Sequence, residues 1–202
     1  MKMLPAVRAL VLTNVLTVAV LPLAAEQPLT PARQALDRLH TAIRQADAQA
    51  AQQAYAQLGK DFAGTDTADE ASWEYACFLT KRGQFDQAQQ LLVSLRQSGR
   101  ENLWVSQALL GLADVAQRRG DEKAMLAYLE EALQAKPAPK GRNCLVPFDP
   151  AQVALPRLAE YYRDKGDYRK AIHYFSRWKP RSFCGTCMQL MERERDQEIA
   201  LC

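Results

Sequence analysis

The protein has 202 residues, a length that fits one domain or a short array of repeats. Ala, Gln, Leu and Arg dominate, and runs of Val, Ile and Thr are nearly absent beyond the first 25 residues, so the composition favours an all-α fold. Those 25 residues hold Lys2 and Arg8 but no acidic side chain. The remainder has 24 basic residues (26 minus 2) and 23 acidic ones, a net charge of +1, which excludes the basic excess typical of nucleic-acid binding.

The first 25 residues have the layout of a secretory signal peptide. Lys2 and Arg8 give a positive start, residues 9–23 form an apolar stretch of about 15 residues, and Ala24 and Ala25 supply small residues after it. A membrane-spanning helix needs roughly 20 apolar residues, so this stretch is short, although an uncleaved N-terminal anchor stays an alternative. We therefore expect an exported protein, periplasmic or secreted, with no stable membrane span once the signal is cleaved.

Residues 26–66 predict a degenerate helical pair. Thr30 followed by Pro31 is typical of a helix start, because Thr caps the N-terminus and Pro fits the first turn. Asp47 lies near the expected turn between the two helices. Thr67 and Glu70 have the spacing of a capping box and predict the start of the next helix.

Three glycine turns mark an internal repeat. Gly83, Gly120 and Gly166 are spaced 37 and 46 residues apart, and each precedes a new apolar periodicity. Glycine suits a helix C-terminus because it reaches left-handed backbone angles without a steric cost. Residues of matching size recur seven before, five after and nine after each glycine: Ala76, Ala113 and Ala159, then Ala88, Met125 and Ala171, then Leu92, Leu129 and Phe175. Each unit reads as helix, turn, helix, and must stack on its neighbour to bury its apolar face.

With these residues the chain resembles the tetratricopeptide repeat family. The middle unit departs from the family pattern at Glu122 and Met125, whereas the fullest unit has Leu155, Leu158, Ala159, Tyr162, Gly166, Tyr168, Ala171 and Phe175. The resemblance implies a right-handed α-solenoid with two repeats over 67–137, an inserted loop over 138–149, a third repeat over 150–181, and a C-x-x-C motif with a capping helix over 182–202. It also implies a non-catalytic scaffold that binds a protein or peptide.

The resemblance further implies a concave groove lined by the first helix of each unit. Trp73 is either an exposed anchor in this groove or a residue that packs against the preceding unit. Trp73 and Cys77 stand where family members that grip a C-terminal carboxylate place Lys and Asn, so that chemistry is not expected. The groove residues that the resemblance implies are Trp73, Cys77, Lys81, Leu110, Asp114, Gln117, Arg118, Glu160 and Arg163.

The cysteines allow three interpretations. In stacked helical pairs, Cys144 should lie at the same edge as Cys184 and Cys187, which favours a structural disulfide in an exported protein. A bridge from Cys144 to Cys184 would close a loop of about 40 residues and stabilise the fold by roughly 4 kcal/mol. Thiol-disulfide exchange at Cys184 and Cys187 and a zinc-clamped array are the alternatives.

Catalytic patterns are absent from the sequence. We find no phosphate-binding glycine loop, no Ser-His-Asp arrangement and no paired carboxylate site. We therefore expect a protein without catalytic residues, cofactor or resident metal, whose partner is a protein or peptide. The sequence leaves the oligomeric state open.

Overall fold

The computed structural model describes residues 30–138, 148–179 and 185–202, with the backbone alone for 185–188. All regular secondary structure in these ranges is α-helical, as the composition predicts. No helix in the described ranges has the length and apolarity needed to cross a bilayer. The expected signal peptide and most of the expected inserted loop lie outside the described residues.

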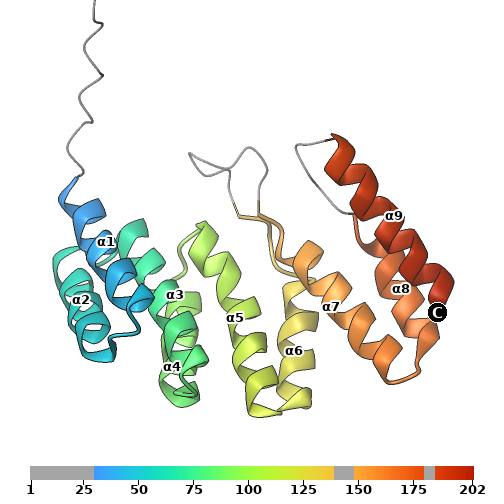
Figure 1. The fold of residues 1–202 in the computed structure, drawn as a ribbon, viewed down its shortest axis with the longest axis horizontal. Coiled ribbons are helices and arrows are strands. Elements are labelled where there is room, and N and C mark those ends of the chain that lie inside the picture. The colour runs from blue at the N-terminus through green and yellow to red at the C-terminus, as the bar shows by residue number, and fades with distance from the viewer. Residues whose placement is uncertain (1–29, 139–147, 180–184) are drawn as a thin grey trace, which may run out of the picture.

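Eight of the described helices form four pairs in chain order, and a ninth follows them (Figure 1). Helices within a pair are joined by a short turn and make the most extensive contacts with each other. The helices are α1 Pro31–Arg44, α2 Ala48–Asp61, α3 Asp66–Lys81, α4 Phe85–Gln97, α5 Leu103–Arg119, α6 Glu122–Ala132, α7 Pro150–Asp164, α8 Tyr168–Arg177 and α9 Gly185–Leu201.

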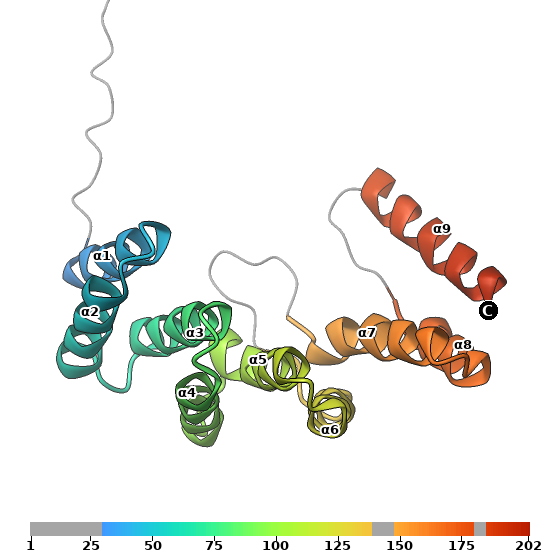
Figure 2. The same ribbon diagram turned by 60° about the horizontal axis from the view of Figure 1, so that its bottom comes forward.

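Each pair packs only against its neighbours. The first helices α1, α3, α5 and α7 contact one another in order, and α2, α4 and α6 each contact the first helix of the next pair. Figure 2 shows the first helices along one side of the array and α2, α4 and α6 along the other. Both ends of the array bend toward the first helices, so we call their side the concave face. The chain is therefore an all-α helical-repeat solenoid, as predicted.

The four turns within the pairs share one backbone geometry. Gly83, Gly120 and Gly166 have φ angles of 77°, 79° and 79°, and Ala46 takes φ 55° at the corresponding place in the first pair. At every turn the next residue donates its N–H to the carbonyl oxygen five residues back, at 2.9–3.0 Å, as from Asp121 to Ala116. This pattern of left-handed residue and backward bond satisfies the last carbonyls of the first helix. The first pair thus has the turn of the other three without their glycine.

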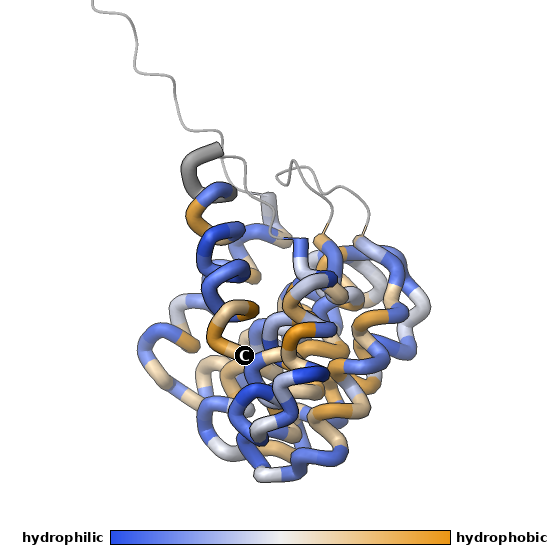
Figure 3. The backbone as a smooth tube through the Cα atoms, turned by 90° about the vertical axis from the view of Figure 1, so that its right-hand side faces the viewer, coloured by the Kyte–Doolittle hydropathy of each residue, from blue (hydrophilic) through white to orange (hydrophobic). Residues whose placement is uncertain are grey.

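The residues that recur around the glycines form the core. All nine aligned positions are buried, and none is more than 6% exposed, which confirms the predicted repeat. Helix α5 joins two apolar clusters, because Leu112 and Val115 pack toward α3 and α4 whereas Leu109 and Ala113 pack toward α7 and α8. Viewed from the C-terminal end, hydrophobic and hydrophilic segments alternate along the helices, so that the visible helices contain both kinds (Figure 3).

A polar network joins two pairs beside this core. Asp69, in the first turn of α3, is 7% exposed and accepts hydrogen bonds from Arg100 Nε at 2.6 Å and from the amide of Asn102. Arg100 also bonds Asp66 Oδ1 at 2.6 Å and the carbonyl of Gly64. Asn102 in turn caps α5 by accepting from Val105 N at 3.0 Å. The connection before α5 is therefore held against the start of α3.

The helix starts confirm one prediction from the sequence and correct another. Thr30 caps α1, with Pro31 in the first turn. The predicted box of Thr67 and Glu70 is wrong, because Thr65 is the N-cap of α3 and accepts from Ala68 N at 3.3 Å. Gly64, at φ 72°, turns the chain so that Thr65 enters the helix in an extended conformation, and Thr67 already lies inside it.

Candidate functional site

Two hollows open between the first helices on the concave face. The α3–α5 hollow has a volume of about 230 Å³ and is lined by Cys77, Thr80, Lys81, Leu92, Gly111, Asp114, Gln117 and Arg118. The α5–α7 hollow has a volume of about 340 Å³ and is lined by Gln117, Gly120, Glu122, Met125, Leu129, Arg157, Glu160, Tyr161 and Asp164. Gln117 belongs to both linings, so the two hollows are neighbours along one groove.

Six of the nine predicted groove residues line these hollows. They come from the inner faces of three successive first helices, and they are Cys77, Lys81, Asp114, Gln117, Arg118 and Glu160. The structure thus brings together the central part of the predicted set. Trp73, Leu110 and Arg163 line neither hollow and have other contacts.

Trp73 is half-buried and packs between two pairs rather than standing free. A Cβ atom on Gly111 of α5 would lie 2.8 Å from Trp73 Cζ3, so the indole lies directly against the backbone of α5. Trp73 therefore packs against the following pair, whereas the alternative from the sequence had placed it against the preceding one. Gly111 is the residue that allows this close approach, and sequence reasoning had not singled it out.

Leu110 is 6% exposed and belongs to the apolar cluster between α5, α7 and α8. The side chain therefore offers almost no surface to a partner. Its place in the groove set came from the family pattern alone. On α5 the neighbouring Gly111 and Asp114 face the α3–α5 hollow instead.

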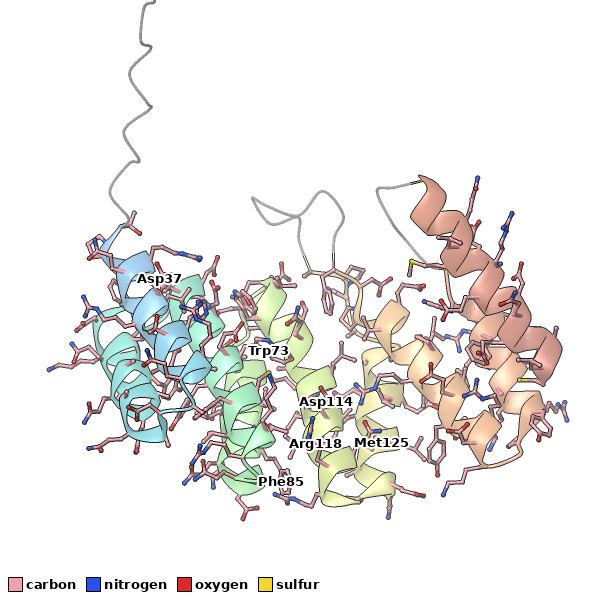
Figure 4. The ribbon with its side chains drawn as sticks, in the orientation of Figure 1. Asp37, Trp73, Phe85, Asp114, Arg118 and Met125 are labelled. Carbon is pink, nitrogen blue, oxygen red and sulfur yellow. The ribbon has the colours of Figure 1, made fainter. Side chains whose placement is uncertain are left out.

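Arg157 of α7 neutralises the middle of the groove. Its guanidinium lies 2.7 Å from Asp114 Oδ1 and donates a hydrogen bond of 3.1 Å to Gln117 Oε1. Asp114 is thus paired across the junction of two repeats, and Gln117 Oε1 accepts a hydrogen bond across the same junction. Figure 4 labels Asp114 and Arg118, one turn apart on α5.

Lys81 and Arg118 lack a charged partner in the part of the chain that the structure describes. Neither side chain makes a hydrogen bond or an ion pair with any described residue, and both are exposed at the rim of the α3–α5 hollow. The floor between them is apolar, formed by Leu92 and Gly111 beside the Cys77 thiol. This hollow therefore offers two cations around a small hydrophobic floor.

Glu160 gives the α5–α7 hollow the opposite charge. Its carboxylate has no hydrogen bond or ion pair within the described part of the chain, and partial burial raises the pKa of Glu160 above its ordinary value. Glu122 and Asp164 line the same hollow but are paired, Glu122 with Lys165 at 2.9 Å and Asp164 with Arg163 at 3.3 Å. Arg163 also pairs with Glu198 of α9, so it is committed within the chain.

One helical pair of the array matches a known family of helical repeats. A sequence model described as tetratricopeptide repeat matches residues 106–139, which run from the first turn of α5 through α6. This segment is similar to a tetratricopeptide repeat, which supports the tetratricopeptide repeat family for the chain. The matched segment is the middle unit, although its Glu122 and Met125 depart from the family pattern. No curated protein matches the sequence.

The other pairs have the same turn and the same stacking as the pair that matches the tetratricopeptide repeat model. Each first helix presents its inner face to the groove, so equivalent positions recur along it. Cys77, Asp114 and Glu160 each stand six residues before a turn glycine, and Lys81 and Arg118 each stand two before one. These two positions therefore supply charged side chains to the groove, and contacts between repeats decide which of them are paired.

Cys77 has no reactive thiolate. The thiol is half-buried, and burial raises the pKa of Cys77 to about 12, with Glu74 and Asp114 adding to the rise. A thiol of this kind is a poor nucleophile at neutral pH. Cys77 and Cys202 are free.

The predicted roles of the remaining cysteines stay untested. Cys144 and Cys184 lie outside the described residues, and of Cys187 only the backbone, inside α9, is described. The disulfide, thiol-exchange and zinc interpretations therefore remain predictions. Among the described residues, no group of His, Cys, Asp and Glu side chains could hold a metal ion.

Proposed function

We propose that this chain of tetratricopeptide-like repeats is a non-catalytic scaffold that binds a segment of a partner protein along the concave face. The observation that carries the proposal is the pair of adjoining hollows with unpaired charges at their rims. Unpaired Lys81, Arg118 and Glu160 surround apolar floors, which is the composition of a peptide-binding surface rather than of a packed interior. The family is generally an interaction module, which agrees with this function.

We further propose that the scaffold acts in the cell envelope. The support is the charge and hydropathy pattern of residues 1–25, which is typical of an export signal. An extracytoplasmic location also fits the use of five cysteines in a chain of this size. Detection of the protein in periplasmic or secreted fractions, with a mature N-terminus near residue 26, would test this part of the proposal.

Photo-crosslinking from two faces of the array tests the binding surface. A photoreactive amino acid is placed at Lys81 in the groove or at Gln90, which is exposed on α4 on the opposite side. After irradiation of living cells, we expect a defined crosslinked partner from position 81 and none from position 90. The same adduct from both positions, or no adduct from position 81, would reject the groove as the binding surface.

A further inference from the structure

The two hollows of the groove have opposite unpaired charge. The α3–α5 hollow has Lys81 and Arg118 without a described partner, and the α5–α7 hollow has Glu160 without one. The ion pair between Asp114 and Arg157 lies at the boundary of the two and satisfies both of its members. Among the residues that line the two hollows, the charges without a described partner are therefore positive in the α3–α5 hollow and negative in the α5–α7 hollow.

We propose that the groove selects a segment of mixed charge, with an acidic side chain in the α3–α5 hollow and a basic side chain in the α5–α7 hollow. This inference rests on the proposed function and specifies the chemistry of the partner. Lys81 and Arg118, which are both exposed at the rim of this hollow, would bind the carboxylate. In the other hollow, the exposed Glu160 would bind the cation.

The width of one repeat fixes the spacing of the two charges. Adjacent packed helices lie about 8–10 Å apart, so the centres of the two hollows are separated by about one such step. An extended chain advances about 3.3 Å per residue, which places the acidic and basic residues about three positions apart. A partner with both charges of one sign at this spacing would leave one hollow with a like charge, which is unfavourable.

The charged groups beside Glu160 are already paired within the chain. Arg163 is held by Glu198 of α9 and by Asp164, and Glu122 is held by Lys165 and Tyr161. Glu160 is exposed in this hollow, and partial burial raises the pKa of its carboxyl group. A partner cation at this carboxylate would oppose that rise.

Selection from a displayed library of random 12-residue peptides tests the proposal with the full chain as bait. We expect enriched peptides to hold Asp or Glu about three positions from Lys or Arg. Reselection with the Lys81→Glu/Arg118→Glu double variant should replace the acidic residue by a basic one and leave the other position unchanged. Reselection with Glu160→Lys should replace the basic residue of the peptides by an acidic one and leave the acidic position unchanged. The Lys60→Glu/Lys123→Glu variant, which reverses two exposed charges outside both hollows, should return the original pattern.

A titration with one enriched peptide provides the quantitative test. The Lys81→Glu/Arg118→Glu variant should weaken its binding by about tenfold or more, a change of about 1.4 kcal/mol or more, whereas the control variant should change it less than about twofold. Far-UV circular dichroism checks that each variant is folded. Enriched peptides without the charge pattern, or with a pattern that the variants leave unchanged, would overturn the inference and leave the groove in place. Failure to enrich any peptide would reject the inference together with the proposed function.

Discussion

Replacing Asp69 by Ala should destabilise the array far more than a comparable change at an exposed aspartate. The Asp69 carboxylate is buried and accepts hydrogen bonds from Arg100 and Asn102. Loss of a hydrogen bond to a charged group costs about 1.5–3 kcal/mol, and the buried Asn102 amide would keep only its 3.2 Å bond to Asp66, at a cost of about 1 kcal/mol. We expect the free energy of unfolding to fall by about 3 kcal/mol, a large part of the ~5–15 kcal/mol that stabilises a typical protein.

Asp86→Ala is the matched control for this change. Asp86 also lies in the first turn of a helix and also pairs with an arginine farther along the chain, Arg119 of α5 at 2.7 Å, but its side chain is 89% exposed. Each variant loses an acidic side chain from the first turn of a helix, so an interaction with the helix dipole is lost in both and the difference between them mainly reports burial. The exposed pair should contribute less than about 1 kcal/mol. Urea denaturation followed by circular dichroism measures both, and equal losses in the two variants would refute the reasoning.

Three further changes test other parts of the structure. Ala46→Gly should raise the free energy of unfolding by about 0.5–1 kcal/mol, because Ala46 has φ 55°, and Gly120→Ala should lower it by about 1 kcal/mol or more. A loss of stability in Ala46→Gly, or a gain in Gly120→Ala, measured by urea denaturation, would contradict the shared turn. The effect of Gly111→Ala on the free energy of unfolding should be about 1–3 kcal/mol more favourable in a Trp73→Ala background than in the wild type, because a Cβ at position 111 meets the indole at 2.8 Å. A double-mutant cycle without coupling energy between the two positions would disprove that contact. At pH 8, Cys77 should react with iodoacetamide at least about a hundredfold more slowly in the folded protein than in urea, because the pKa of the folded thiol is about 12; peptide mass spectrometry measures both rates. The thiol of the unfolded chain ionises first as the pH rises. The contribution of Cys77 to the free energy of unfolding, measured against Cys77→Ala, is therefore present below about pH 8.5 and falls above that value.

The glycine spacing predicted the repeats because left-handed turns leave a mark in the sequence. Gly83, Gly120 and Gly166 all have positive φ, and the residues at fixed offsets from them form the core. The first pair was harder to recognise because its turn uses Ala46, and Leu39 stands where the other pairs have a buried Ala. Backbone geometry is shared by all four turns, but the residue type that reveals it is present in three.

The charge state of the groove could not be predicted because it depends on contacts between repeats. Asp114 pairs with Arg157, 43 residues later, across a junction enlarged by the segment around residues 138–149. Arg163 pairs with Glu198 of α9, whose position follows from the chain path after α8. Family-pattern reasoning assigns a residue to the groove by its place on one helix. It therefore found Lys81, Arg118 and Glu160 but could not distinguish them from their paired neighbours.

Native-state hydrogen exchange, resolved by helix, tests most directly whether the pairs are stabilised by stacking in line, on which the groove depends. Phe175 is 1% exposed in the last pair, and Phe175→Ala should cost about 3–5 kcal/mol locally. In a linear array, each pair interacts only with its neighbours, so the loss should be largest in α7 and α8, smaller in α5 and α6, and smallest in α1 and α2. An equal loss of protection in all four pairs would show a single shared core and contradict the stacked array.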